Sequence, residues 1–140
     1  MMSESKDVGA PVMRPHAADV VFAPGIVSIW VGRLPDEKAL DDYVAFRYPP
    51  DDEGWSPFTR DHGLLGIDED FAEAASWEPE PHSFVDHSYG ESFAPAADLD
   101  LARRMPGASC AYLLYDIDAR QIPASAASPL VFLGAYPHRK

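Results

Sequence analysis

The sequence predicts an α+β fold, a single domain with a largely antiparallel sheet of three to four strands covered on one face by helices. Short stretches rich in branched and aromatic residues occur once early and twice late, at 26–32, 109–116 and 130–136. Helical patterns lie between them, at 36–47 and 85–105. With 140 residues, 46% of them hydrophobic, the chain is long enough for one core and too short for two.

The first strand is expected at 26–32, with the sequence IVSIWVG. Successive side chains of a strand point to opposite faces of the sheet. Val27, Ile29 and Val31 therefore share one face. Trp30 lies on the other face, so both faces of this strand are apolar and the strand is expected well inside the sheet.

The first helix is expected to begin at Asp36, whose carboxylate can accept the free backbone amides of the first turn. Leu40, Tyr43 and Val44 recur at helical spacing and form its inward stripe. The prolines at 49–50 are expected to end it.

The acidic stretch that follows is rich in turn residues and predicts only short elements. A short helix is expected at 56–62, where Ser56 would cap the helix and Pro57 would take the first helical position. A further helical turn is expected within 68–75, followed by a short edge strand at 75–78.

The second long helical pattern runs from 85 to 105 but contains Pro95, which lacks an amide and clashes with the preceding turn. A break or kink is therefore expected near Ala94. The second half of this helix is expected to point three residues inward: Leu99, Ala102 and Met105.

Composition limits the classes of function. Residues 1–24 have no sustained period and predict a flexible arm before a domain at 25–140. The single cysteine, Cys110, cannot form an intrachain disulfide, and no apolar run is long enough to cross a bilayer. A cytoplasmic protein is therefore expected. The sequence pI near 4.6 argues against binding to nucleic acid or to anionic membranes.

The negative charge is concentrated in one part of the chain. Residues 36–100 contain 18 acidic and three basic side chains, a balance of -15, whereas the rest of the chain has five acidic and eight basic ones, a balance of +3. Concentrated like charge destabilises a compact state. Such a segment is therefore expected to keep the protein soluble or to meet a positively charged partner.

Candidate catalytic and metal-ligating residues form no convincing site. His62, His82 and His87 lie near one another in sequence, but there is no His-Glu-x-x-His helix and no pair of cysteines. Ser92 lies in GESFA, which departs from the G-x-S-x-G nucleophile elbow and follows no confident strand. We therefore expect no metal, no cofactor and no enzymatic activity.

Six short blocks follow one another along the chain: VSIWVG at 27–32, DYV at 42–44, SPFTRDHG at 56–63, IDEDFAEA at 67–74, SYGESF at 88–93 and FLGAYP at 132–137. In this order they resemble the bacterial immunity protein 22 family of polymorphic toxin systems, over residues 26–137. The resemblance implies a small cytoplasmic protein that binds and silences a toxin and has no catalytic residues.

Combined with the toxin partner that the resemblance implies, the acidic segment leads to the hypothesis of an inhibitor that covers its toxin, a basic nuclease, with an acidic face. Carboxylates can occupy places where a nuclease expects phosphates, and opposite potentials speed association. Trp55 would serve as an apolar anchor among them. The expected toxin-binding residues are Asp36, Glu37, Asp41, Asp42, Asp51, Asp52, Glu53, Trp55, Asp68, Glu69 and Asp70.

Two alternatives remain open from the sequence. One is a small hydrolase that uses Ser92 with His87, which would require the two side chains to lie within hydrogen-bonding distance. The other is a generic interaction module whose acidity serves solubility, which would require carboxylates spread evenly over the surface.

Overall fold

The computed structural model describes residues 22–48, 54–64, 67, 69–76, 84, 87 and 89–139. The elements in chain order are β2 (Phe22–Gly32), α2 (Glu37–Val44), α3 (Pro57–His62), the 3-10 turn η2 (Glu69–Phe71), β3 (Ala72–Ser76), α4 (Gly90–Arg104), β4 (Cys110–Ile117) and β5 (Leu130–Pro137). Most of the arm predicted at 1–24 lies outside the described residues, and β2 begins three residues before 25.

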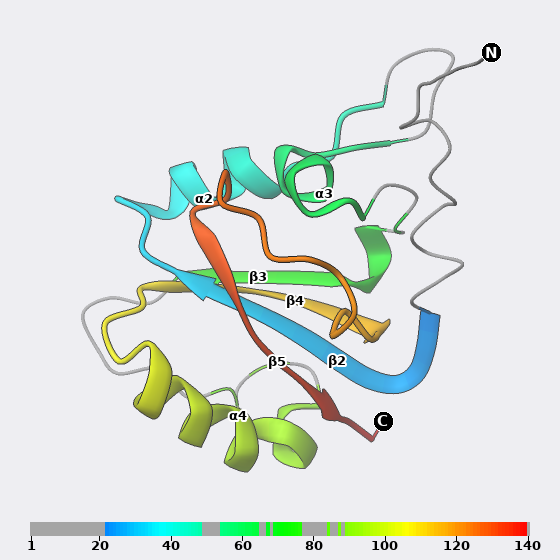
Figure 1. Ribbon diagram of the computed structural model, residues 1–140, viewed down its shortest axis with the longest axis vertical. Coiled ribbons are helices and arrows are strands. Elements are labelled where there is room, and N and C mark those ends of the chain that lie inside the picture. The colour runs from blue at the N-terminus through cyan, green and yellow to red at the C-terminus, as the bar shows by residue number, and fades with distance from the viewer. Residues whose placement is uncertain are drawn as a thin grey trace, which may run out of the picture.

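The four strands form one antiparallel sheet in the order β3-β4-β2-β5. The α+β class with an antiparallel sheet is thus confirmed. Helices α2 and α3 cover one face of the sheet, and α4 covers the other face as well, which the sequence did not predict (Figure 1). The central strands β2 and β4 present apolar side chains on both faces, so each face needs a cover of its own.

Each face of the sheet has its own hydrophobic core, and β2 supplies both as the alternation predicts. Trp30 belongs to the core under α2 and α3, with Leu40, Phe58 and Tyr112. The core under α4 is formed by the opposite face of the sheet, by one side of the helix and by Phe84, which precedes the helix: Val27, Ile29, Val31, Phe84, Phe93, Ala94, Ala97, Leu101, Ala111, Leu113, Tyr115, Leu133 and Tyr136.

The N-terminal boundaries of α2 and α3 agree with the sequence signals. Asp36 caps α2 as predicted. Ser56 caps α3 and exchanges hydrogen bonds with Thr59 in a capping box, with Pro57 at the first helical position. The C-terminal end of α2 differs, because the helix ends at Val44, before the prolines that were expected to end it.

The predictions for α4 require correction. The helix begins at Gly90 and continues through Pro95 without a break. Pro95 is the sixth residue of α4, and the amide that it lacks would have bonded to the carbonyl of Glu91. The helix therefore lacks this one hydrogen bond but is not interrupted. Its buried side is set by Phe93 and Leu101, while Leu99, predicted inward, is 52% exposed. The edge strand β3 also lies three residues earlier than the predicted 75–78.

A bulge distorts the edge strand β5. Ile29 pairs with Gly134 and Trp30 with Phe132, so Leu133 is an extra residue on the β5 side. Arg104 of α4 donates hydrogen bonds to the carbonyl oxygens of Phe132, at 3.1 Å, and of Leu133. The end of α4 is thereby fixed to the bulged part of the edge strand.

A second irregularity lies in β2, next to the buried side chain of Asp116. The register between β2 and β4 shifts between Phe22 and Val27, and Gly25 within this segment has φ 87°. The amide of Gly25 donates to Asp116 Oδ1 at 2.9 Å, and Nε2 of the buried His138 lies 3.2 Å from the same oxygen. Asp116 itself has φ 61°. One carboxylate thus joins the start of β2, the end of β4 and the segment after β5.

Candidate functional site

The predicted acidic residues of α2 lie on its solvent side. Asp36 accepts a hydrogen bond from the backbone amide three residues ahead at 2.8 Å, which commits one of its oxygens to the helix. Glu37 and Asp41 are exposed. Asp42 forms an exposed ion pair with Lys38 at 2.8 Å, a contact that stabilises little in water. The helix thus presents carboxylates to solvent.

The second group of predicted acids lies at η2. Glu69 and Asp70 are exposed in this turn, which leads into β3. Glu69 accepts a hydrogen bond from the hydroxyl of Tyr48, so the turn is joined to the segment that follows α2. The remaining predicted acids lie outside the described residues: Asp51, Asp52, Glu53 and Asp68.

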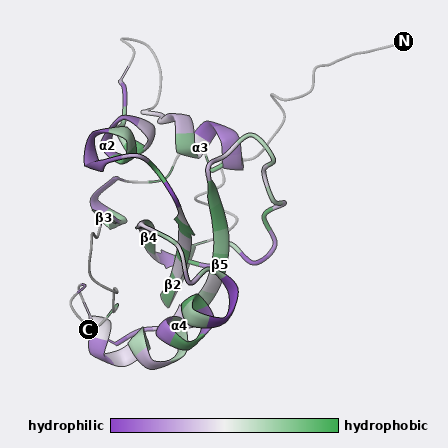
Figure 2. Cartoon of the chain, turned by 90° about the vertical axis from the view of Figure 1, so that its left-hand side faces the viewer, coloured by the Kyte–Doolittle hydropathy of each residue, from purple (hydrophilic) through white to green (hydrophobic). Residues whose placement is uncertain are grey.

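Four other acids of the 36–100 segment do not lie with the predicted acids of α2 and η2. Glu73, Asp98 and Asp100 each accept a hydrogen bond from a neighbouring residue of the fold. Glu91 is exposed, but like Asp98 and Asp100 it belongs to α4, across the sheet from α2. Hydrophilic stretches occur on both helices, at opposite ends of the view in Figure 2. The fold therefore divides the negative charge that the sequence concentrates in one segment.

Trp55, predicted as an apolar anchor, is partly buried, and two guanidinium groups lie over its indole ring. The Cζ atoms of Arg47 and Arg60 lie 5.0 and 4.7 Å from its ring centroid. Arg47 and Trp55 also exchange two backbone hydrogen bonds, of 2.6 and 2.9 Å. The sequence reasoning missed these arginines, although two of the three basic residues in 36–100 flank Trp55.

The structure does not assemble the nucleophile and base of the hydrolase alternative. Ser92 donates its hydroxyl proton to the carbonyl oxygen of Tyr89 at 2.8 Å and accepts the amide of Arg139 at 2.9 Å. His87 Nδ1 lies 2.9 Å from a carboxylate oxygen of Glu73. A serine whose proton points at a backbone carbonyl is not poised for general-base activation.

The histidines do not gather into a metal site in the part of the chain that the structure describes. There, no group of three or more histidine, cysteine or acidic side chains could hold a metal ion. His62 is buried against Trp30 and Phe58, and His82 lies outside the described residues. Cys110 is also buried, which raises the pKa of its thiol to about 11. In the same part of the chain, no helix has the length and apolar character to span a membrane.

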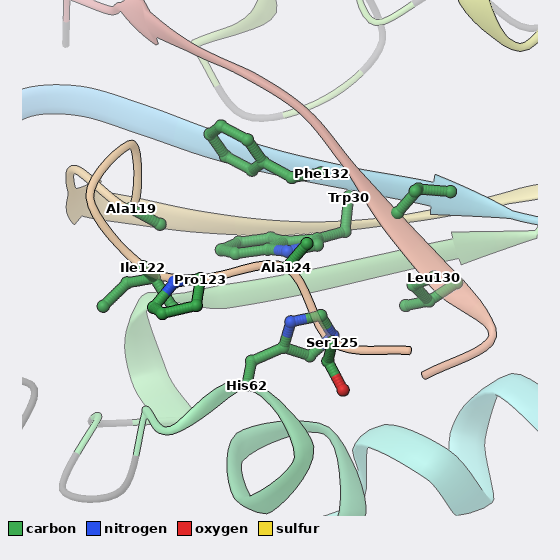
Figure 3. Close-up of a pocket in the computed structure, with 10 residues that line it drawn as sticks. Trp30, His62, Ala119, Ile122, Pro123, Ala124, Ser125, Leu130 and Phe132 are labelled. Carbon is green, nitrogen blue, oxygen red and sulfur yellow. The ribbon is translucent and has the colours of Figure 1, made fainter. Parts of the chain in front are cut away.

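A small cavity lies beside His62, where the loop after β4 folds over the sheet (Figure 3). Its volume is about 40 Å³, enough for water and too little for a metabolite. Within the described chain, Nε2 of the buried His62 has no hydrogen-bond partner. The walls of the cavity are mostly apolar: Trp30, His62, Ala119, Ile122, Pro123, Ala124, Ser125, Leu130, Val131 and Phe132.

Burial of His62 predicts a dependence of stability on pH. Desolvation lowers the pKa of His62 below its ordinary 6.5, so below pH 6.5 the unfolded chain binds more protons at this position than the folded one. His62 is therefore expected to reduce the free energy of unfolding as pH falls from about 6.5 towards its folded pKa. Urea unfolding of the wild type and of His62→Gln between pH 5 and 8 measures this, and the wild type should lose more stability than the variant on acidification. Parallel pH profiles would contradict the expectation.

Comparison with known proteins gives one match. The model of the family described as Immunity protein 22 matches residues 27–138, most of the described domain. The resemblance seen in the sequence is thereby confirmed. No curated protein and no solved structure matches the chain.

Proposed function

The chain belongs to the immunity protein 22 family, and we propose that it neutralises its cognate toxin by covering a positively charged surface of that toxin with helix α2. Family membership implies a toxin partner and a role that is typically non-enzymatic. The charge of the chain supports the finer proposal that the toxin is a basic nuclease, because carboxylates can stand where such an enzyme binds phosphates.

The exposed acids of α2 are the observation that carries the proposal. Glu37 and Asp41 lie on the solvent side of the helix, while Leu40 and Val44 on the other side are buried in the first core. The carboxylates therefore stand on a helix that is held by the sheet. The proposed interface extends to the other predicted residues: Asp36, Asp42, Asp51, Asp52, Glu53, Trp55, Asp68, Glu69 and Asp70.

Reversal of charge on α2 is expected to slow association with the cognate toxin. Asp41→Lys should lower the association rate constant roughly threefold at low salt, and Glu37→Lys added to it should lower the rate further, because steering depends on the field of the whole acidic surface. Stopped-flow association at two salt concentrations measures this, and the variants should show a weaker salt dependence than the wild type.

Glu91→Lys is the matched control, because it reverses one exposed charge on α4, across the sheet. Its effect on association should be smaller than that of Asp41→Lys. Equal slowing by both variants would point to net charge in place of a localised acidic face. A wild type that neither binds the toxin nor inhibits its activity would refute the proposed function itself.

A further inference from the structure

A compact group of aromatic and cationic side chains lies between α2 and α3, in the most acidic half of the chain. We define this Arg–Trp patch as Phe46, Arg47, Tyr48, Trp55 and Arg60. Phe46 and Tyr48 stack with ring centroids 6.3 Å apart, and Tyr48 is 61% exposed. Tryptophan, tyrosine and arginine are the residue types most enriched among the residues that dominate binding energy at protein interfaces.

The two arginines of the patch are not used in ion pairs within the described chain. Arg47 and Arg60 are exposed, and their guanidinium groups lie over the indole of Trp55, while the described ion pairs of other cations involve Lys38, Arg120 and histidines. A guanidinium stacked on a ring by its face keeps its N–H groups at the edge, where they can form paired hydrogen bonds with a carboxylate. The patch thus offers two such donors, both placed by the same indole ring.

The patch is held in place before any partner binds. The two backbone hydrogen bonds between Arg47 and Trp55 join the segments on either side of it. A Cβ atom at Gly54 would lie 2.3 Å from Cε1 of Tyr48, so the ring of Tyr48 lies directly across this glycine. Arg60 stands on the short helix α3, which a capping box fixes at its start. Groups fixed in this way lose little conformational freedom on binding.

We propose that the Arg–Trp patch binds a carboxylate-bearing segment of the cognate toxin, and this inference rests on the proposed function. The patch follows α2 directly in the chain, and α2 and α3 lie side by side in both views (Figures 1 and 2). The interface then has two neighbouring parts of opposite sign, the acids of α2 and the cations of the patch. A toxin docked in the wrong orientation would bring like charges together, and their repulsion disfavours that orientation.

The charge around the patch favours a protein carboxylate over a nucleic acid as the occupant. A nucleic acid is anionic along its whole length and needs many cations to neutralise it. Here two arginines stand in a segment with a balance of -15. A toxin that is basic overall and carries an acidic side chain at one point complements both the acids of α2 and the cations of the Arg–Trp patch.

Binding of the purified toxin by the intact chain tests the inference. Arg60→Glu and Trp55→Ala should each weaken binding by about thirtyfold, mainly through faster dissociation, as expected for residues in close contact. Arg60→Lys keeps the charge but loses the paired hydrogen bonds, and it should fall between Arg60→Glu and the wild type. Arg103→Glu, at an exposed position of α4, is the control and should change the dissociation rate less than twofold.

The results separate this inference from the proposed function. If the wild type binds the toxin and the patch variants bind as tightly, the patch inference is wrong and the proposed function stands. If the wild type does not bind, both are overturned. Rescue of Arg60→Glu by reversal of one acidic residue of the toxin would support the inference and identify its partner. Tight binding of a single-stranded DNA oligonucleotide that depends on Trp55 would overturn it in favour of a nucleic acid.

Discussion

Replacement of Phe58 by alanine is expected to destabilise the fold by about 3 to 5 kcal/mol. Phe58 is fully buried, and its ring lies 5.0 Å from that of Trp30, 4.7 Å from Tyr112 and 4.5 Å from His62, measured between centroids. The substitution loses apolar burial and leaves a cavity where α3 meets the sheet. The midpoint of urea-induced unfolding should fall strongly at neutral pH with little change in slope.

Leu99→Ala is the control for this expectation and discriminates between the sequence pattern and the structure. The pattern predicts Leu99 inward, but the side chain is 52% exposed on α4. Its removal is therefore expected to change the free energy of unfolding by less than about 0.5 kcal/mol, as for an ordinary surface position. A loss comparable to that of Phe58→Ala would contradict the phase of α4 described here.

The second large effect is expected for Asp116→Ala, which should destabilise the fold by about 3 to 5 kcal/mol. The partly buried amide of Gly25 would lose its acceptor. His138, whose Nδ1 has no hydrogen-bond partner in the described chain, would also lose the contact of Nε2. Alanine would further be strained at φ 61°. Thermal unfolding followed by circular dichroism measures the loss.

Asp116→Asn should restore much of this stability, because asparagine tolerates the left-handed region and keeps a carbonyl oxygen for Gly25. Asp118→Ala serves as a neighbouring control. Asp118 pairs with Arg120 near the surface, where a salt bridge contributes roughly 0 to 1 kcal/mol. If Asp116→Ala were no more harmful than Asp118→Ala, the carboxylate would not hold the bulge of β2.

The local elements of the fold follow from the sequence because their signals are local. The alternation in IVSIWVG assigns Val27 and Trp30 to opposite faces, and the structure places them in separate cores. Asp36 and Ser56 are found as caps because capping involves only neighbouring backbone amides. Several blocks in a fixed order suffice to show the family.

The arrangement of these elements in space could not be predicted in the same way. The order of the strands depends on contacts between residues that are distant in the sequence. The side of the sheet that each helix covers depends on the same contacts. The phase of α4 was missed because small residues, Ala94 and Ala97, form part of its buried side. The arginines around Trp55 were missed because a backbone pairing between 47 and 55 brings one of them to the ring.

The hydrogen bonds of Arg104 have a consequence for how this protein meets other chains. An outer strand with unpaired carbonyl groups is a template onto which a strand of another molecule can add, and this is a common route to aggregation. On β5, Arg104 occupies the carbonyl oxygens of Phe132 and Leu133 at the bulge. An incoming strand would have to displace the guanidinium first. Addition of a strand of another molecule is therefore disfavoured at this part of β5.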